Sequence, residues 1–69
     1  MTRNETREAT RAEAVAPLNP AMAARMLANL HRAASRRSQE HIEQRIGRLG
    51  LWNRVTNING ALVAVGGEQ

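Results

Sequence analysis

Hydrophobic positions divide the chain into a polar first quarter, two helical stripes and a β-type tail. Residues 2–14 contain no large apolar side chain, and the first one after Met1 is Val15. Threonine and arginine repeat every four residues in this segment, a spacing that aligns like side chains along one side of a helix. A helix without an apolar stripe has little to bury against a core. We therefore expect residues 1–16 to form a polar helix or arm that is loosely held.

A break at residues 17–20 separates this arm from a single small domain over 17–69. Pro17 ends the first helix, and Asn19 followed by Pro20 is a typical N-cap and first helical position. The next helix has one apolar face, made by Met22, Met26, Leu30 and Ala33, with Ala23, Leu27 and Ala34 beside it. This periodicity predicts an amphipathic helix.

A third helix is predicted to follow a second break. If the second helix continued, Arg37 would fall among the apolar residues, so the helix should end or bend near residues 35–37. Ser38 would then cap the next helix and Gly50 would stop it. Its apolar face consists of Ile42, Ile46 and Leu49. One continuous helix over 20–49 is the alternative, but the polar gap in the stripe favours two helices.

The tail has the pattern of two short strands. Asn59-Gly60 lies between two segments rich in β-branched residues, and this pair provides the positive φ angles of a type I′ turn. An isolated hairpin is marginal in water, so it must pack on the helices or extend a partner's sheet. A short helix over 61–65 is the competing interpretation. The predicted fold class is mainly α: a helical hairpin preceded by a loosely held helix, with a C-terminal β-hairpin or extension at 54–65.

Composition leaves this domain short of material for a core. The chain has 69 residues, and alanine makes up much of its 42% apolar fraction. Trp52 is the only aromatic residue, and there is no cysteine for a disulfide or a zinc site. A core of this size is marginal, so we expect a protein partner or self-association to complete it. The predicted partner interface consists of Met26, Leu30, Ile42, Ile46 and Trp52, with Trp52 near its centre.

The net charge of +4 is concentrated in the middle of the chain. Charges sum to zero over residues 1–16 and over 38–69, so the excess comes from a basic patch of Arg25, Arg32, Arg36 and Arg37. Arg32, Arg36 and Arg37 are interpreted as solvated cations at a helix C-terminus, or as a contact for an acidic protein surface. Binding of nucleic acid is the alternative, because two helices joined near 35–38 outline a helix-turn-helix. Its contacts would come from Arg32, Arg36, Arg37, Gln39, His41 and Arg45.

Residues for catalysis are not found in any convincing pattern. The chain has no Asp, Cys or Tyr, and neither His31 nor His41 belongs to a catalytic constellation. His41 stands beside Glu40 and Glu43, but it lacks a second strong metal ligand four residues away. No glycine-rich phosphate loop is present. We therefore expect no enzyme activity, no catalytic residue, no metal, no cofactor and no small-molecule substrate.

Location and function follow from these exclusions. No apolar run has the length of a bilayer-spanning helix, and the N-terminus lacks the apolar core of a secretory signal. We expect no membrane association and a cytoplasmic location, or a place within a phage or host assembly, since Arg- and Ala-rich composition suggests a GC-rich bacterial or phage genome. The leading hypothesis is a small non-catalytic interaction module: an accessory, inhibitor or minor structural subunit of a larger assembly, or a homo-oligomer. The alternative is a small nucleic-acid-binding regulator.

Overall fold

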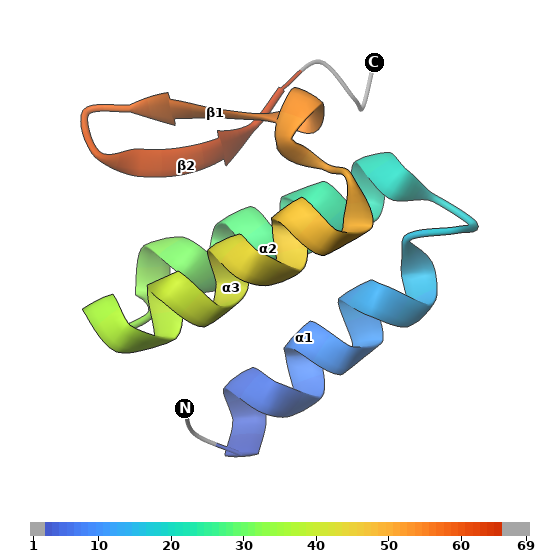
Figure 1. Cartoon of the computed structure of the whole chain (residues 1–69), viewed down its shortest axis with the longest axis horizontal. Coiled ribbons are helices and arrows are strands. Elements are labelled where there is room, and N and C mark those ends of the chain that lie inside the picture. The colour runs from blue at the N-terminus through green and yellow to red at the C-terminus, as the bar shows by residue number, and fades with distance from the viewer. Residues whose placement is uncertain (1–2, 66–69) are drawn as a thin grey trace.

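Three helices are followed by a two-stranded antiparallel sheet in the computed structural model, which describes residues 3–65 and the side chains from Arg7 onward (Figure 1). The helices are α1 (Arg3–Val15), α2 (Pro20–Ala33) and α3 (Arg36–Leu49). A 3₁₀ turn, η1 (Trp52–Arg54), leads into β1 (Val55–Ile58) and β2 (Ala61–Ala64). The mainly α fold class and the hairpin are confirmed, and the short helix considered for 61–65 is wrong.

Local signals set the start of α2 and the break before α3. The side-chain oxygen of Asn19 accepts a hydrogen bond from the backbone N–H of Met22 at 3.1 Å, and Pro20 is the first helical residue. The predicted break is confirmed, but its cap is Ser35, whose Oγ accepts from the N–H of Ser38 at 3.4 Å. Ser38 was therefore the wrong cap: Ala34 and Ser35 are already extended, so the next helix begins one turn earlier than predicted.

The end of α3 and the hairpin turn both use backbone with positive φ. Gly50 adopts the left-handed conformation with φ 72°, and the N–H of Leu51 bonds to the carbonyl of Ile46 at 2.9 Å, which ends the helix as predicted. Asn59 and Gly60 have φ values of 53° and 86°, as a type I′ turn requires. The strands pair in the register Val55↔Ala64 and Ile58↔Ala61.

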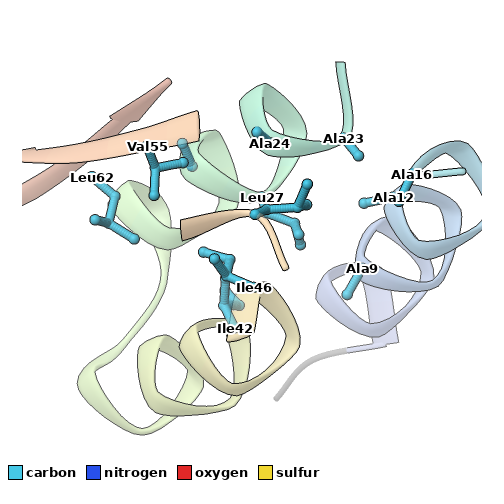
Figure 2. Packing of buried hydrophobic residues seen from close by; sticks show 12 residues of the cluster. Ala9, Ala12, Ala16, Ala23, Ala24, Leu27, Ile42, Ile46, Val55 and Leu62 are labelled. Atoms are coloured by element: carbon cyan, nitrogen blue, oxygen red, sulfur yellow. The ribbon is translucent and has the colours of Figure 1, made fainter. Parts of the chain in front are cut away.

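Helix α2 is the centre of the molecule, with α1, α3 and the hairpin packed around it. Leu27 of α2 and Ile42 and Ile46 of α3 are fully buried, and Figure 2 shows Leu27 between these isoleucines and the alanines of α1. Leu51, Val55 and Leu62 cover the same core. Leu51 and the hairpin thus fold back over the core that was expected to be completed by a partner or by self-association.

The buried apolar side chains of α1 are alanines, with Val15 partly buried beside them. Ala9, Ala12 and Ala16 are buried, and Figure 2 shows Ala23 of α2 beside the last two. Their spacing of three and four residues places the methyl groups on one side of α1. The expectation that this segment has little to bury against the core is therefore wrong, whereas its being loosely held stays a prediction. Small side chains let two helices approach closely without a stripe of leucine or isoleucine.

The buried face of α2 also differs from the predicted one. Its fully or almost fully buried residues are Ala23, Ala24, Leu27, Ala28 and His31. Met22 and Ala33 of the predicted face are exposed, and Met26 and Leu30 are only partly buried. The reason is that α2 has neighbours on several sides. Small side chains occupy the close helix contacts, Leu27 fills the core, and Met26 and Leu30 lie at its margins.

Candidate interaction surface

The five residues predicted to form one partner interface are divided between the core and the surface. Ile42 and Ile46 are fully buried within the chain, so neither can contact a partner in this fold. Met26 and Leu30 are partly buried against the core. Trp52 is 48% exposed. Of the predicted interface, Trp52 is the residue that presents a large apolar surface to solvent.

The indole of Trp52 lies against the last turn of α3. A Cβ atom added at Gly47 would come within 3.2 Å of the indole Nε1 and 3.8 Å of Cδ1. A glycine inside a helix costs about 1 kcal/mol relative to alanine, and here it leaves room for the ring. One side of the indole is thus held by α3, while nearly half of the side chain remains available to a partner.

Most of the exposed large apolar residues belong to segments that lie at one end of the molecule. Five large apolar residues are exposed among the described side chains: Leu18, Met22, Trp52, Ile58 and Val65. Leu18 and Met22 belong to the connection between α1 and α2 and to the first turn of α2, whereas Trp52 and Val65 belong to η1 and the residue after β2. Figure 1 shows these segments at the same end, and Ile58 is beside the hairpin turn at the opposite end.

An open groove of about 630 Å³ lies between these segments, and we call it the end groove. One wall consists of Glu13, Ala16, Pro17 and Pro20, at the end of α1 and the start of α2. The other wall consists of Arg48, Leu49, Gly50, Leu51, Asn53 and Arg54, at the end of α3 and in η1. Apolar and cationic groups are therefore side by side in this groove.

Glu13 neutralises part of the charge of the end groove. Its Oε2 accepts hydrogen bonds from the guanidinium groups of Arg45 and Arg48, which ties α1 to α3. Arg54, on the same wall as Arg48, is partly buried and has no hydrogen-bond or ion-pair partner among the side chains that the structure describes. The groove therefore contains one unpaired guanidinium.

The four arginines of the predicted basic patch have different surroundings. Arg32 donates to the carbonyl of Leu62 at 2.8 Å and to Asn29, so it joins α2 to β2. Arg25 is exposed on α2. Arg36 and Arg37 are exposed in the first turn of α3, and their predicted place at a helix C-terminus is wrong because Ser35 starts a new helix before them.

Other residues considered for nucleic-acid contact are engaged within the chain. The side-chain amide of Gln39 donates to the carbonyl of His31 at 2.8 Å, and Arg45 pairs with Glu13. Of the six candidate contacts, Arg36, Arg37 and His41 are exposed and have no such partner among the described residues. Three of the six residues proposed to contact nucleic acid are therefore engaged in contacts within the fold.

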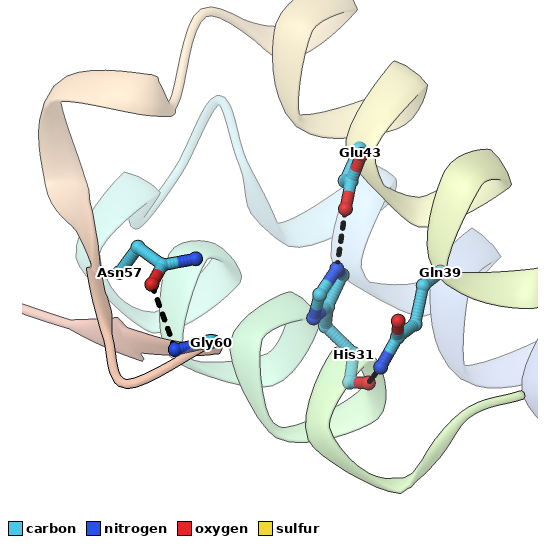
Figure 3. Close-up of polar contacts among 5 residues, drawn as sticks. All are labelled: His31, Gln39, Glu43, Asn57 and Gly60. Carbon is cyan, nitrogen blue, oxygen red and sulfur yellow. Dashed lines mark hydrogen bonds and ion pairs between the residues drawn. The ribbon is translucent and has the colours of Figure 1, made fainter. Parts of the chain in front are cut away.

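A buried histidine connects α2 to α3 (Figure 3). His31 is 4% exposed, its Nε2 lies 2.7 Å from Oε2 of Glu43, and its buried Nδ1 has no partner. The sequence analysis did not pair these two residues, and placed Glu43 near His41 instead. The sequence did contain a signal for the burial of His31, because this residue follows Leu27 by four positions and therefore lies on the same face of the helix. The described residues contain no cluster of three or more His or Glu side chains that would hold a metal ion.

The end groove was not predicted from the sequence. Its walls come from segments that are distant in the sequence, and six of its ten lining residues lie outside the three α-helices. The positions of Pro17, Gly50 and Arg54 were visible in the sequence, but their proximity depends on how α1 and α3 pack around α2.

In the described part of the chain, no helix is long and apolar enough to cross a membrane.

Comparisons with known proteins give no match. No family model fits the chain, no curated protein is similar to it in sequence at a significant level, and no solved structure is similar to it in fold. The function is therefore inferred from the surface of the molecule.

Proposed function

We propose that this chain is a non-catalytic protein-interaction module and that it binds its partner at the end that carries the end groove. The observation that carries the proposal is that four exposed large apolar residues, Leu18, Met22, Trp52 and Val65, belong to the segments at this end, and that neighbouring residues of these segments line the groove. Scattered exposed apolar residues are normal on a monomer, but several of them at the end that also carries a concave site are typical of an interface.

Two further features support this proposal. Trp52 is held on one side by α3, so little side-chain freedom would be lost when a partner covers its other side. Tryptophan is also strongly enriched among the residues that contribute most to binding. The walls of the groove combine apolar surface with arginine, which is the composition of the centre of many protein interfaces.

Site-specific photo-crosslinking tests this proposal. A photoreactive amino acid is placed at position 18, which is 87% exposed, and in a second variant at position 58, which is 53% exposed. Position 58 is the matched control, because it is an exposed apolar site beside the hairpin turn at the opposite end. We expect a discrete protein adduct in native cells from position 18 and none from position 58.

The composition of the adducts decides between functions. Adducts to a different protein, or to a second copy, support the interaction module. Sedimentation of the purified chain across a dilution series then separates a homo-oligomer from a complex with another protein. Adducts to nucleic acid from position 18, or equal protein adducts from both positions, would contradict the proposal.

A further inference from the structure

We propose that the end groove receives a peptide segment that combines an apolar side chain with a carboxylate, and that Arg54 binds this carboxylate. This inference rests on the proposed function and names the chemistry of its partner. It starts from the unpaired guanidinium of Arg54 in a groove whose walls combine apolar and charged residues.

The backbone of Arg54 is held in place before any ligand binds. Its N–H donates to the carbonyl of Leu51 at 2.9 Å, and its carbonyl accepts from the N–H of Val65 at 3.0 Å. The side chain therefore extends from a held backbone, and it is partly buried. A planar guanidinium matches a carboxylate with two parallel hydrogen bonds, and this pairing is stronger where water is partly excluded.

The rest of the groove favours a peptide over a phosphate backbone. Pro17, Pro20 and Leu51 line it with apolar surface, which is suited to an aliphatic or aromatic side chain. Arg48, beside them, is already paired with Glu13, so Arg54 is the one guanidinium of the groove without a partner among the described residues. One such cation suits a single carboxylate better than a row of phosphates.

Charge argues for a different protein over a second copy. The chain carries a net charge of +4, so two copies repel one another. Glu13 and Glu43 are already bound to Arg45, Arg48 and His31. Among the side chains described, only Glu8 and Glu40 remain as carboxylates without such a partner. An acidic partner therefore complements this surface better than the chain complements itself.

An array of short peptides, blocked at both ends, tests the inference with the full chain. Each peptide has Glu at its centre between two apolar residues, which are Leu, Ile, Phe or Trp, and each has matched versions with Gln or Lys in place of Glu. We expect the best Glu peptide to bind about ten-fold more tightly than its Gln version. Its binding should shift the backbone amide resonances of residues 48–54 and of Ala16.

Substitution at Arg54 assigns the preference to this residue. Arg54→Gln should bind the Glu and Gln peptides equally, with the affinity for the Gln peptide unchanged. Arg25→Gln is the control, because Arg25 is exposed on α2 outside the groove, and it should keep the preference. Circular dichroism of both variants confirms that they remain folded.

Each other outcome overturns the proposal in a recognisable way. Equal binding of Glu and Gln peptides in the groove would contradict the carboxylate and leave the interaction module standing. Concentration-dependent doubling of mass without peptide binding would assign the groove to a second copy. An oligonucleotide that displaces the best Glu peptide would assign it to nucleic acid and contradict the proposed function too. If no peptide of the array binds, the inference is wrong.

Discussion

Helix α2 has a different kind of contact on each of two sides. Towards α1, the buried side chains are the methyl groups of Ala9, Ala12 and Ala16. Towards α3 and the hairpin, they include Ile42 and Ile46. Most of these residues are fully buried, but each isoleucine buries three more carbon atoms than an alanine, at about 0.8 kcal/mol per buried CH₂. The buried fraction of a side chain therefore does not measure how firmly its helix is held.

The end groove crosses the boundary between these two contacts. One of its walls belongs to the end of α1 and the connection that follows, and the other belongs to α3 and η1. If α1 is the more weakly held helix, it is also the movable wall of the proposed binding site. The comparison between the two sides of α2 therefore bears on both stability and function, and the following changes test it.

The largest effect is expected for Ile46→Ala. Removing a fully buried isoleucine side chain leaves a cavity and costs about 2–5 kcal/mol, whereas Ile46→Val should cost about 0.5–1.5 kcal/mol. The first value is a large share of the stability of a domain this small. The free energy of unfolding in urea measures both. The control is Ile58→Ala, at a residue that is 53% exposed, and it should cost less than about 1 kcal/mol. Equal losses at positions 46 and 58 would contradict the core assigned here.

Ala12→Leu should have the next largest effect and should act on α1 alone. The alanine is fully buried against α2, so a larger side chain forces the two helices apart at a cost of about 1–3 kcal/mol. We expect lost helicity in α1, while amide resonances of α3 and the hairpin keep their dispersion. Ala14→Leu is the matched control, since Ala14 is exposed on the same helix. Global unfolding caused by Ala12→Leu would show that α1 is an inseparable part of the core.

Local signals in the sequence were sufficient for most helix ends and for the hairpin. Asn19 with Pro20, Gly50, and Asn59 with Gly60 each act through the backbone of their own segment, so their effect is readable without the fold. The cap at Ser35 was missed because Ser38 offered the same chemistry three residues later. Two serines at this spacing are both competent caps, and only the path of the chain selects one.

Contacts between segments were harder to predict, for a physical reason. Periodicity identifies the side of a helix that is apolar, but α2 has neighbours on several sides, so no single stripe describes its buried surface. The burial of His31 was missed because the histidines were weighed only as catalytic or metal-binding residues, whereas Glu43 from α3 lies 2.7 Å from its Nε2 in the fold. The end groove required the relative positions of α1 and η1, which no local pattern contains.

Amide hydrogen exchange compares the two sides without any substitution. We expect amides of residues 9–15 in α1 to exchange at least about ten-fold faster than those of residues 42–46 in α3. The reason is that α1 can open locally when its alanine contacts separate, at a lower free energy than opening of the isoleucine core. Equal protection in both helices of a verified monomer would show that α1 and α3 unfold as one cooperative unit. In that case α1 would not be a movable wall of the end groove.

The smallest effect is expected for Glu13→Gln, which removes the carboxylate that joins α1 to α3. Glu13 is 30% exposed and its partners Arg45 and Arg48 are 21% and 61% exposed, so water screens both ion pairs. Pairs of this kind contribute at most about 1 kcal/mol, and salt weakens them further. Glu40→Gln is the control, because Glu40 is exposed on α3 and has no such partner among the described residues.

The salt dependence of that loss separates the two ways in which α1 can be held. If alanine contacts dominate, Glu13→Gln lowers stability by less than about 1 kcal/mol in dilute buffer, and the difference from the unsubstituted chain vanishes at high salt. Urea unfolding at low and at 1 M salt measures this, with exchange in α1 as the local readout. A loss above about 2 kcal/mol that persists in high salt would mean that the Glu13 pairs hold α1 in place. In that case α1 and α3 would differ in how they are held: α1 by ion pairs, and α3 by buried apolar area.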